Sequence, residues 1–375
     1  MRGITVIGSS FGAVSAVREL RRRDPAIPIS VVAPRAELVY QASLIWVPVG
    51  LRRGDDLRLP LTPFYDRLGV RFIAGRARGL DAAGRRIHLE DGTSLENDGL
   101  IIATGSRFIK TLPGIEHAMT LCEGVEAATA IQRRLQGLQG GTIAIGFAGN
   151  PAEPTVVRGG PMFELLLGIE TWLRRTHRRD RFRLVLFSPS ARPGERLGAR
   201  AVDGLLDQMR RRGIEAHLGH KLLKFEADAV HTEGGVVPAD AILFMPGLTG
   251  PAWVQGSGLP LSPGGFVRAD AYLRVPGLEQ VYVVGDAGSY PGPDWMPKQA
   301  HMADRQGKVA AVNLLDALLG RTPTRVARPE LMCIIDSLDS GTLVYRSERH
   351  GLVLRSAMLH WAKGWFERRY AAALR

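Results

Sequence analysis

The first residues of the chain carry the pattern that most restricts its fold. Residues 4–7, ITVI, form a short apolar run that predicts a buried strand, and Gly8 follows at the point of a tight turn. The next segment places Val14, Val17 and Leu20 on one face of a predicted helix, and residues 27–32, IPISVV, predict a second strand. A strand, a helix and a second strand of these lengths form a βαβ unit, which indicates a parallel sheet.

The loop between the first strand and the helix, GSSFGA, is a variant of the G-x-G-x-x-G fingerprint for dinucleotides. Gly8 makes the turn, Ser10 replaces the glycine that lets a pyrophosphate approach, and Ala13 replaces the close-packing third glycine. These residues are small, so the N-terminus of the helix remains open to phosphate. The second strand ends in VAPR without the acidic residue that usually binds the ribose, and alone the loop is equally typical of a structural turn.

Two later segments favour a nucleotide site. Residues 99–107, GLIIATGSR, and residues 281–287, VYVVGDA, each predict a short buried strand that ends in small or acidic residues. Ligands of open α/β sheets bind at this carboxyl edge. Asp286 would accept a hydrogen bond from a ribityl hydroxyl, and Gly105 would allow close approach of the backbone.

These three segments, in this order and spacing, resemble the FAD domain of the two-dinucleotide-domain flavoprotein superfamily, and the resemblance covers nearly the whole chain. It implies FAD as the cofactor. The residues expected to contact FAD are Gly8, Ser10, Phe11, Gly12, Ala13, Ala33, Pro34, Arg35, Ser43, Ala77, Ala103, Thr104, Gly105, Gly285, Asp286, Pro297, Lys298 and Gln299.

Residues 113–240 repeat the βαβ pattern, but their first loop lacks a fingerprint. After the predicted strand at residues 143–145 the loop runs through GFAGNPAEPTVVRGGP, and prolines remove N–H groups that would bind a pyrophosphate. The following strand ends in FSP and not in the Glu of pyridine-nucleotide-dependent relatives. We expect that this loop does not hold NADH.

The predicted fold class is therefore α/β, with two Rossmann-like dinucleotide-binding domains, the second inserted in the first, and a short C-terminal amphipathic helical segment. The expected divisions are an FAD-binding domain in two parts, 1–112 and 241–330, a second domain with a degenerate fingerprint, 113–240, and a C-terminal segment that covers the flavin, 331–375.

Several segments resemble the sulfide:quinone oxidoreductase and flavocytochrome c sulfide dehydrogenase branch of this superfamily, which has lost the second fingerprint. They are YQASLIWVPVG (40–50), ILFMPGL, GGFVRADAYLR, MPKQAHMADRQGKVAA, MCIIDSLDSG and MLHWAKGWFERRY. The resemblance implies oxidation of sulfide or a related sulfur compound and reduction of quinone. Lys298 would then hydrogen-bond the flavin or a quinone oxygen.

The resemblance assigns the catalytic chemistry to cysteine next to the flavin. Cys333 matches the cysteine of the C-terminal segment, Cys122 stands where many members have their first cysteine, and Glu164 matches an acidic residue that would accept a proton. The central cysteine is missing, because Arg158 or Val157 stands in its place. Three alternatives remain: Cys122 and Cys333 pair in a rearranged relay, Cys333 acts alone while the nucleophile attacks the flavin directly, or Arg158 binds an anionic sulfur compound other than sulfide.

The last predicted helix is amphipathic. Met358, Trp361, Ala362, Trp365 and Phe366 share one face, and cations including Lys363 occupy the rest. Aromatic side chains beside cations suit the interface of an anionic bilayer, where quinone would enter, although the face also suits packing against the protein itself or a dimer mate. We expect a cytoplasmic protein with peripheral contact at the inner face of the membrane, and a homodimer is left open.

Composition excludes several other classes. The formal charge of +12 comes with no zinc finger or other nucleic-acid signature, so we expect no nucleic-acid partner. Two cysteines are too few for a disulfide scaffold or a tetrahedral zinc site, and we expect no metal, no secretion leader and no spanning helix. Two functions compete with the favoured one: a type II NADH:quinone oxidoreductase, and a flavoprotein subunit or redox sensor that passes electrons to a protein partner.

Overall fold

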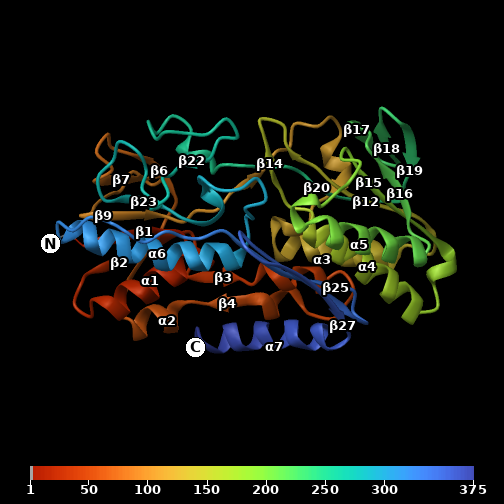
Figure 1. Cartoon of the computed structure of the whole chain (residues 1–375), viewed down its shortest axis with the longest axis horizontal. Helices are drawn as coiled ribbons and strands as arrows, with labels where there is room; N and C mark the ends of the chain where they lie inside the picture. Colours follow the sequence, from red (N-terminus) through yellow and green to blue (C-terminus); the bar gives the residue numbers. More distant parts are fainter. Residues whose placement is uncertain (1–2) are drawn as a thin grey trace.

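The computed structural model describes residues 3–375 and contains two five-stranded parallel sheets that lie end to end (Figure 1). The first sheet has the order β23-β9-β1-β2-β5. Its strands are β1 (Ile4–Ile7), β2 (Ile29–Ala33), β5 (Arg71–Ala74), β9 (Gly99–Ile102) and β23 (Val281–Val283). We call this sheet, with the elements that cover it, the first unit.

Two helices cover one face of the first sheet, and an antiparallel sheet covers the other. The helices are α1 (Phe11–Arg23) and α6 (Ala300–Leu318), and the small sheet is formed by β6 (Ala77–Leu80), β7 (Arg86–Leu89) and β8 (Ser94–Glu96). The helices approach closely at Gly307, where a Cβ would lie 2.3 Å from the Gly12 carbonyl oxygen. Glycine at this position therefore lets α6 pack against the start of α1.

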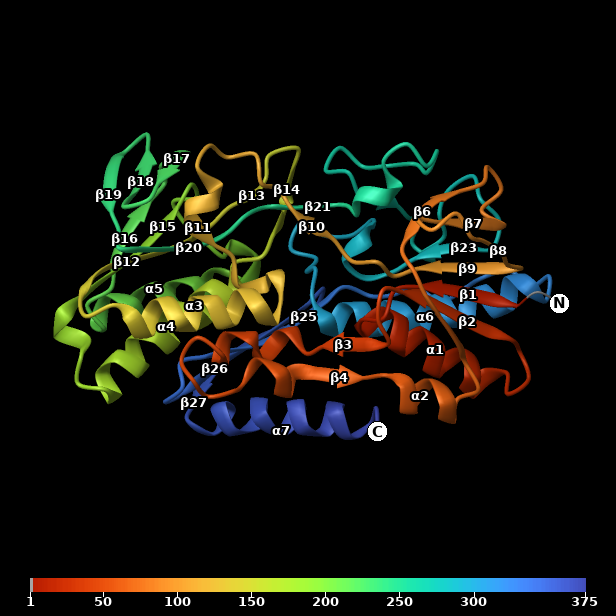
Figure 2. The same cartoon turned by 180° about the vertical axis from the view of Figure 1, so that it is seen from behind.

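The second unit repeats this plan with the order β11-β20-β12-β15-β16. Its strands are β11 (Ala118–Met119), β12 (Gly141–Phe147), β15 (Phe182–Ser188), β16 (Glu215–Leu218) and β20 (Ala241–Met245). One face carries α3 (Val125–Gly137), α4 (Gly160–Arg175) and α5 (Ala199–Arg211), and the other carries β17 (Leu222–Glu226), β18 (Ala229–Thr232) and β19 (Gly235–Pro238). Figure 2 shows these layers from behind.

The predicted fold class is confirmed, because the second sheet lies between two parts of the first in the sequence. The division expected at residue 240 is wrong in one respect. β20 pairs in parallel with β12 and β11, so the second sheet continues to Met245. The run AILFM is buried on both faces, which is typical of a central parallel strand.

Short antiparallel pairs and one parallel pair complete the two units. They are β3 (Glu37–Val39) with β4 (Arg58–Pro60), β10 (Arg107–Phe108) with β21 (Leu248–Thr249), β13 (Gly149–Asn150) with β14 (Glu153–Val157), and β22 (Val267–Arg268) with β24 (Gly288–Ser289). The short helix α2 (Thr62–Arg67) precedes β5.

The C-terminal segment is a three-stranded antiparallel sheet followed by a helix. The strands are β25 (Glu330–Asp336), β26 (Gly341–Ser347) and β27 (Gly351–Ser356), and the helix is α7 (Met358–Ala372). Figures 1 and 2 show α7 running along one long side of the molecule, from this sheet back toward the first unit. The segment therefore bridges the two units.

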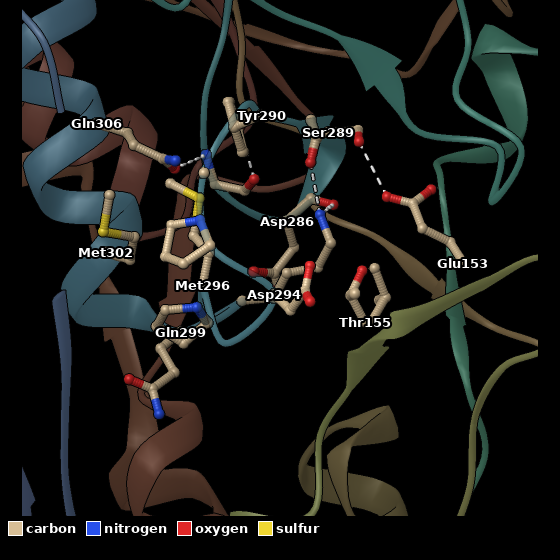
Figure 3. Close-up of a pocket in the computed structure, with 17 residues that line it drawn as sticks. Glu153, Thr155, Asp286, Ser289, Tyr290, Asp294, Met296, Gln299, Met302 and Gln306 are labelled. Atoms are coloured by element: carbon tan, nitrogen blue, oxygen red, sulfur yellow. Dashed lines mark hydrogen bonds between the residues drawn. The ribbon is translucent and has the colours of Figure 1, made fainter. Parts of the chain in front are cut away.

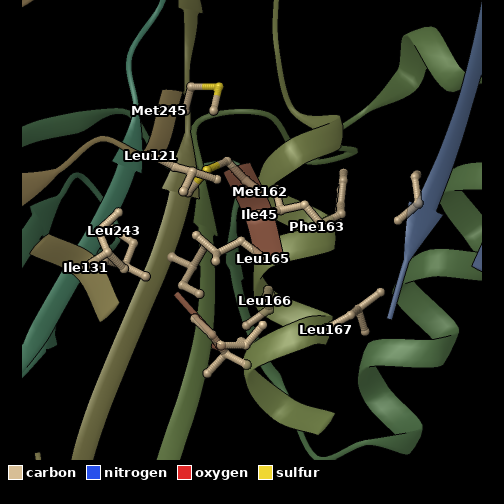
Figure 4. Packing of buried hydrophobic residues seen from close by; sticks show 14 of the residues in the cluster. Ile45, Leu121, Ile131, Met162, Phe163, Leu165, Leu166, Leu167, Leu243 and Met245 are labelled. Carbon is tan, nitrogen blue, oxygen red and sulfur yellow. The ribbon is translucent and has the colours of Figure 1, made fainter. Parts of the chain in front are cut away.

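The largest apolar core also joins the units (Figure 4). Ile45 comes from a 3₁₀ turn at Gln41–Trp46 in the first unit and packs beside Met162 and Leu165 of α4. Leu243 of β20 and Ile335 of β25 belong to the same cluster. One continuous core across both units and the C-terminal segment holds them in a fixed relation.

Candidate active site

The turn after β1 brings the backbone close to a ligand position. Gly8 has a φ of +122°, and a Cβ there would lie 2.2 Å from the Ala103 carbonyl oxygen, so only glycine fits. Ser10 makes no side-chain hydrogen bond to the start of α1, which leaves the first amides, beginning at Phe11, able to bind phosphate. Gly12 lies against Val284, since a Cβ there would be 3.1 Å from Val284 Cγ2.

Other predicted contact residues lie at the same carboxyl edge of the first sheet. Gly105 has a φ of +72°, and a Cβ there would have open space around it, while the Thr104 hydroxyl accepts a hydrogen bond from Trp253 Nε1 at 3.1 Å. Ala77 is buried at the start of β6. The edge as a whole presents Gly8, Ser10, Phe11, Gly12, Ala13, Ala33, Pro34, Arg35, Ala103, Thr104 and Gly105.

A cavity opens beyond β23 (Figure 3). Its wall includes the predicted residues Gly285, Asp286, Pro297, Lys298 and Gln299, together with residues of β14 and the start of α6. The wall is held by hydrogen bonds that Figure 3 shows. The Gly285 N–H donates to Gln306 Oε1 at 2.8 Å, and the Tyr290 hydroxyl donates to the Gly285 carbonyl at 2.7 Å.

The residue that stands in place of the missing cysteine reaches this cavity wall. Arg158 forms an ion pair with Asp286 and donates a hydrogen bond to the Lys298 carbonyl at 3.3 Å. A carboxylate has about four acceptor positions, so the pair leaves Asp286 able to accept from a ribityl hydroxyl. Arg158 therefore fixes a positive charge beside the expected flavin ligand.

Lys298 points into the protein and not into solvent. Its ammonium donates to the carbonyls of Gly288 at 2.5 Å and Asp286 at 3.2 Å, and it lies 3.9 Å from the centre of the Phe266 ring. Burial lowers the pKa of Lys298 to about 8. Lys298 is therefore not a solvated surface residue, and its expected hydrogen bond to a flavin or quinone oxygen stays a prediction.

The loop after β12 forms a hairpin in place of a nucleotide turn. Strands β13 and β14 dock on the first unit, where Asn150 Nδ2 donates to the carbonyls of Leu248 at 2.8 Å and Gly264 at 3.1 Å. Glu153 accepts from the hydroxyls of Ser262 at 2.5 Å and Ser289 at 2.9 Å. Helix α4 begins only at Gly160, well after the end of β12. A hairpin therefore connects β12 to α4 in place of the short turn that presents a helix N-terminus to a pyrophosphate.

The end of β15 is equally unsuited to a nucleotide. Phe187 is fully buried and stacks on Phe244, with ring centres 5.9 Å apart. A Cβ on Gly146 would lie 2.4 Å from the Phe187 ring, so this glycine accommodates an aromatic side chain and not a ligand. The arrangement supports the interpretation that the second unit does not hold NADH.

The two cysteines are free thiols and do not bond to each other. Cys122 lies in the 3₁₀ turn Leu121–Glu123 and Cys333 lies in β25, and both pack against the core that joins the units. Burial raises the pKa of Cys122, with Arg158 acting in the opposite direction, and burial raises the pKa of Cys333 to about 12. The charge of Glu164 raises the pKa of both thiols further.

Glu164 is buried in α4 and belongs to a polar cluster inside the core. It forms an ion pair with Lys363 of α7, whose residue is only 9% exposed. Lys363 thus lies off the aromatic face, as predicted, but it is buried against the protein. Burial raises the pKa of Glu164 to about 7, although Lys363 opposes the shift. A carboxyl group with this pKa can accept and release protons near neutral pH.

A second buried carboxylate lies next to this pair. Asp336, at the end of β25, is fully buried and accepts a hydrogen bond from Trp46 Nε1 at 2.6 Å. His360 Nδ1 lies 3.0 Å from Asp336 Oδ2. Cys333, the predicted catalytic thiol, lies three residues before Asp336 in the same strand.

Comparison with known proteins agrees with this geometry. The model of the pyridine nucleotide-disulphide oxidoreductase family matches residues 2–307. This chain belongs to the pyridine nucleotide-disulphide oxidoreductase family. Membership makes it an FAD-dependent oxidoreductase.

Individual members of the family differ in how much of the chain they match. The sulfide-quinone reductase of Aquifex aeolicus is 24% identical over 355 residues, which are 89% of this chain and 80% of the relative. An NADH dehydrogenase-like protein of Mycobacterium tuberculosis is 30% identical over 177 residues, 46% of this chain and 41% of the relative. The solved structure of the Aquifex aeolicus sulfide:quinone oxidoreductase superposes with a TM-score of 0.91 at 21% identity, covering 99% of this chain and 91% of that chain.

The residues of this oxidoreductase fit FAD. Besides the open amides at α1, two predicted contact residues have buried polar atoms without a partner, Ser43 Oγ and Gln299 Oε1. Buried polar atoms are nearly always hydrogen-bonded in a complete site. Gln299 lines the cavity, so a flavin bound there could supply a partner for its Oε1. Within residues 3–375, no group of three or more His, Cys, Asp or Glu side chains is arranged to hold a metal ion.

Sequence reasoning missed three residues of the polar cluster: Asp336, His360 and Lys363. A signal for two of them was present, because His360 and Lys363 share a helical stripe with Glu367 and Tyr370, opposite the aromatic face. Asp336 carried no signal, since only the fold brings β25 against Trp46.

In the described part of the chain, no helix has the length and apolar character needed to cross a bilayer.

Proposed function

We propose that this oxidoreductase takes electrons from sulfide or a related sulfur compound and gives them to quinone. The observation that carries the proposal is the β13–β14 hairpin, because it replaces the short turn with which a second unit would bind NADH as electron donor. The likeness to the Aquifex aeolicus sulfide-quinone reductase extends over most of both chains and supports the same assignment.

The overall reaction sets what the residues must do. The chemistry that bound FAD supplies is transfer of two electrons from a donor to an acceptor. Oxidation of hydrosulfide to zero-valent sulfur releases two electrons and one proton, and reduction of a quinone to a quinol takes up two electrons and two protons. Each turnover therefore consumes one proton from the surroundings, in addition to the proton that the donor releases.

On the donor side, Cys333 and Cys122 are the proposed sulfur-binding groups and Glu164 the proposed proton acceptor. A thiol is reactive only as thiolate, and both thiols have raised pKa values in this structure. Glu164, which influences both thiols and has a pKa of about 7, is the group placed to take their protons. Both cysteines are free, and the proposal includes a thiol acting alone as well as a Cys122–Cys333 relay.

The position of Arg158 supports a third alternative, in which the electron donor is an anionic sulfur compound other than sulfide. Its guanidinium forms an ion pair with Asp286. It also lowers the pKa of the Cys122 thiol by its charge and by a hydrogen bond, against the effect of burial. A fixed guanidinium would bind an anionic sulfur compound. We propose that it holds the anionic end of the substrate, whether hydrosulfide or a larger sulfur anion.

On the acceptor side, we propose that α7 brings the protein to a membrane surface. Its outer face exposes apolar side chains, including Trp361 with 74% of its surface exposed, Met358, Trp365 and Phe366. Arg368 and Arg369 lie on the same helix and would contact anionic headgroups. The proposed location is cytoplasmic, at the inner face of the membrane. We also propose that the chain is organised as the predicted domains, with the second ending after β20.

An anaerobic titration tests the proposal. Sulfide and NADH are added separately to the purified FAD-loaded protein while the flavin absorbance is followed. We expect stoichiometric bleaching by sulfide and none by NADH. Bleaching by NADH alone would establish an NADH:quinone oxidoreductase, and bleaching by neither would indicate a flavoprotein subunit or redox sensor that receives electrons from a protein partner.

A further inference from the structure

Helix α7 turns several polar side chains inward and leaves its large aromatic side chains exposed. The only residues of this helix that are buried are Lys363 and Gly364. His360, Lys363, Glu367 and Tyr370 share the inner stripe, while the large apolar side chains face out. The end of α7 is held by apolar packing, because Tyr370 contacts Phe11 and Tyr40, so packing alone does not explain why Lys363 is buried at the middle of the helix.

Two of these residues enter one cluster with two carboxylates. Lys363 is paired with Glu164 and lies 5.5 Å from the centre of the Trp46 ring, and His360 Nδ1 lies 3.0 Å from Asp336 Oδ2. The charge of Asp336 raises the pKa of Glu164, and a hydrogen bond from the Asp336 backbone to Glu164 lowers it. The cluster thus runs from His360, whose side chain is 16% exposed, to Glu164, which is buried.

The charges of these four groups do not balance without a proton. Glu164 and Asp336 carry two negative charges when ionised, and Lys363 carries one positive charge. The remaining negative charge in the core is costly unless a proton sits on His360 or on Glu164. Hydrogen bonds from His360 and Trp46 together with the Lys363 charge outweigh burial and lower the pKa of Asp336, so this carboxyl is not the group that takes the proton.

Other charged groups near His360 are already paired. Arg52 lies over the opposite side of Trp46, 4.8 Å from the ring centre, and is bonded to Glu367 at 2.9 Å. The neighbour of His360 on its own helix, Trp361, is uncharged and contacts the imidazole edge to face, with ring centres 5.5 Å apart. Within the cluster, Glu164 is the carboxyl group that can hold a proton near neutral pH, because burial raises its pKa to about 7.

We propose that Glu164, Lys363, Asp336 and His360 form a store for one proton, which enters from solvent at His360 and is used at Glu164 during reduction of the acceptor. The inference rests on the proposed function for its acceptor, since a quinone takes up two protons with its two electrons and the donor releases only one. His360 and Asp336 act through Glu164 and are positioning residues.

The kinetic test uses enzyme that has been reduced anaerobically with dithionite, so it does not depend on sulfide. The reduced enzyme is mixed with decylubiquinone, which takes up protons, or with ferricyanide, which takes up electrons alone. In His360→Gln we expect reoxidation by decylubiquinone to slow at least about tenfold at pH 8, within the usual range for lost proton transfer, and reoxidation by ferricyanide to change less than about twofold. The matched control is His350→Gln, because His350 is exposed in the turn between β26 and β27.

Chemical rescue distinguishes proton transfer from structural damage. In His360→Ala, added imidazole should restore the decylubiquinone rate and leave the ferricyanide rate unchanged. Equal losses with both acceptors, or no loss with either, would overturn the proposal.

A second measurement needs no turnover. In protein labelled with ¹⁵N in histidine, the His360 signal is assigned by its loss in His360→Gln. Glu164→Gln removes a negative charge from the cluster, so a shared proton predicts that the ¹⁵N chemical shifts of the His360 ring change at pH 7, while those of His350 do not. Unchanged His360 chemical shifts would contradict the store, whereas failure of sulfide to bleach the flavin would contradict only the proposed function.

Discussion

Glu164 and Lys363 form a buried ion pair although 199 positions separate them in the sequence. Glu164 belongs to α4 of the second unit, and Lys363 belongs to the C-terminal helix. The pair therefore ties the last helix of the chain to the core that carries both predicted catalytic thiols. The site is therefore complete only when the C-terminal segment is docked on the second unit.

Loss of one partner of this pair should destabilise the protein. Lys363→Met leaves Glu164 buried without a cation, which typically costs about 3 kcal/mol. We expect a lower melting temperature of the FAD-loaded protein in differential scanning calorimetry. The double variant Glu164→Gln/Lys363→Met removes both charges and should recover much of the loss. A double variant no more stable than Lys363→Met would contradict the ionic explanation.

The pH dependence of stability should report Glu164. Its pKa is raised from 4.5 to about 7 in the folded protein, so between these values the folded state binds more protons than the unfolded state. This group therefore contributes stability at low pH that is lost as the pH rises toward 7. The Glu164→Gln variant has no carboxyl group to titrate at this position, so its stability does not fall in this way. The free energy of unfolding of the variant, relative to that of the natural protein, should therefore rise between about pH 4.5 and 7. Urea unfolding at several pH values measures it, and a constant difference would show that Glu164 does not titrate there.

Replacement of Cys333 should separate donor chemistry from the flavin itself. Cys333→Ser preserves the size of the side chain but removes the thiol beside Glu164, and we expect bleaching by sulfide to slow by about a hundredfold or more. Dithionite should still bleach the flavin fully, which serves as the control. Cys122→Ser, measured in the same way, distinguishes a thiol acting alone from one that needs both cysteines. Unchanged bleaching in Cys333→Ser would move the sulfur chemistry to another residue.

Membrane contact should depend on the outer face of α7. Trp361→Ala/Trp365→Ala removes two exposed aromatic side chains, and we expect at least about tenfold weaker binding to anionic phosphatidylglycerol vesicles. Leu319→Ala is a suitable control, because Leu319 is 66% exposed at the far end of α6. Sedimentation with vesicles measures the binding. Equal binding by the double variant and the control would show that α7 is not the contact surface.

The sequence predicted the parts of this protein that depend on local pattern. The run ITVIGSSFGA forms β1, its turn and the start of α1, and the Pro-rich loop before Gly160 does not form a nucleotide turn. Buried strands, helix faces and glycines with positive φ are properties of short segments, so they can be inferred without a structure.

The contacts between distant segments could not be predicted in this way. The hairpin β13–β14 was recognised only as an irregular loop, because its partners Leu248 and Gly264 follow about a hundred residues later. The inward position of Lys363 was missed for a similar reason: an amphipathic pattern shows that a helix has two faces, and not which one is covered. The polar cluster is the part of the site that only the fold could reveal.

A crystal structure of the FAD-loaded protein grown with excess NADH would test the central claim most directly. We predict flavin in the cavity lined by Asp286 and Gln299, Ser43 and Gln299 hydrogen-bonded, and no dinucleotide at the β13–β14 hairpin. A nicotinamide stacked on the flavin with its pyrophosphate at the start of α4, or a first unit that does not bind flavin, would contradict the account.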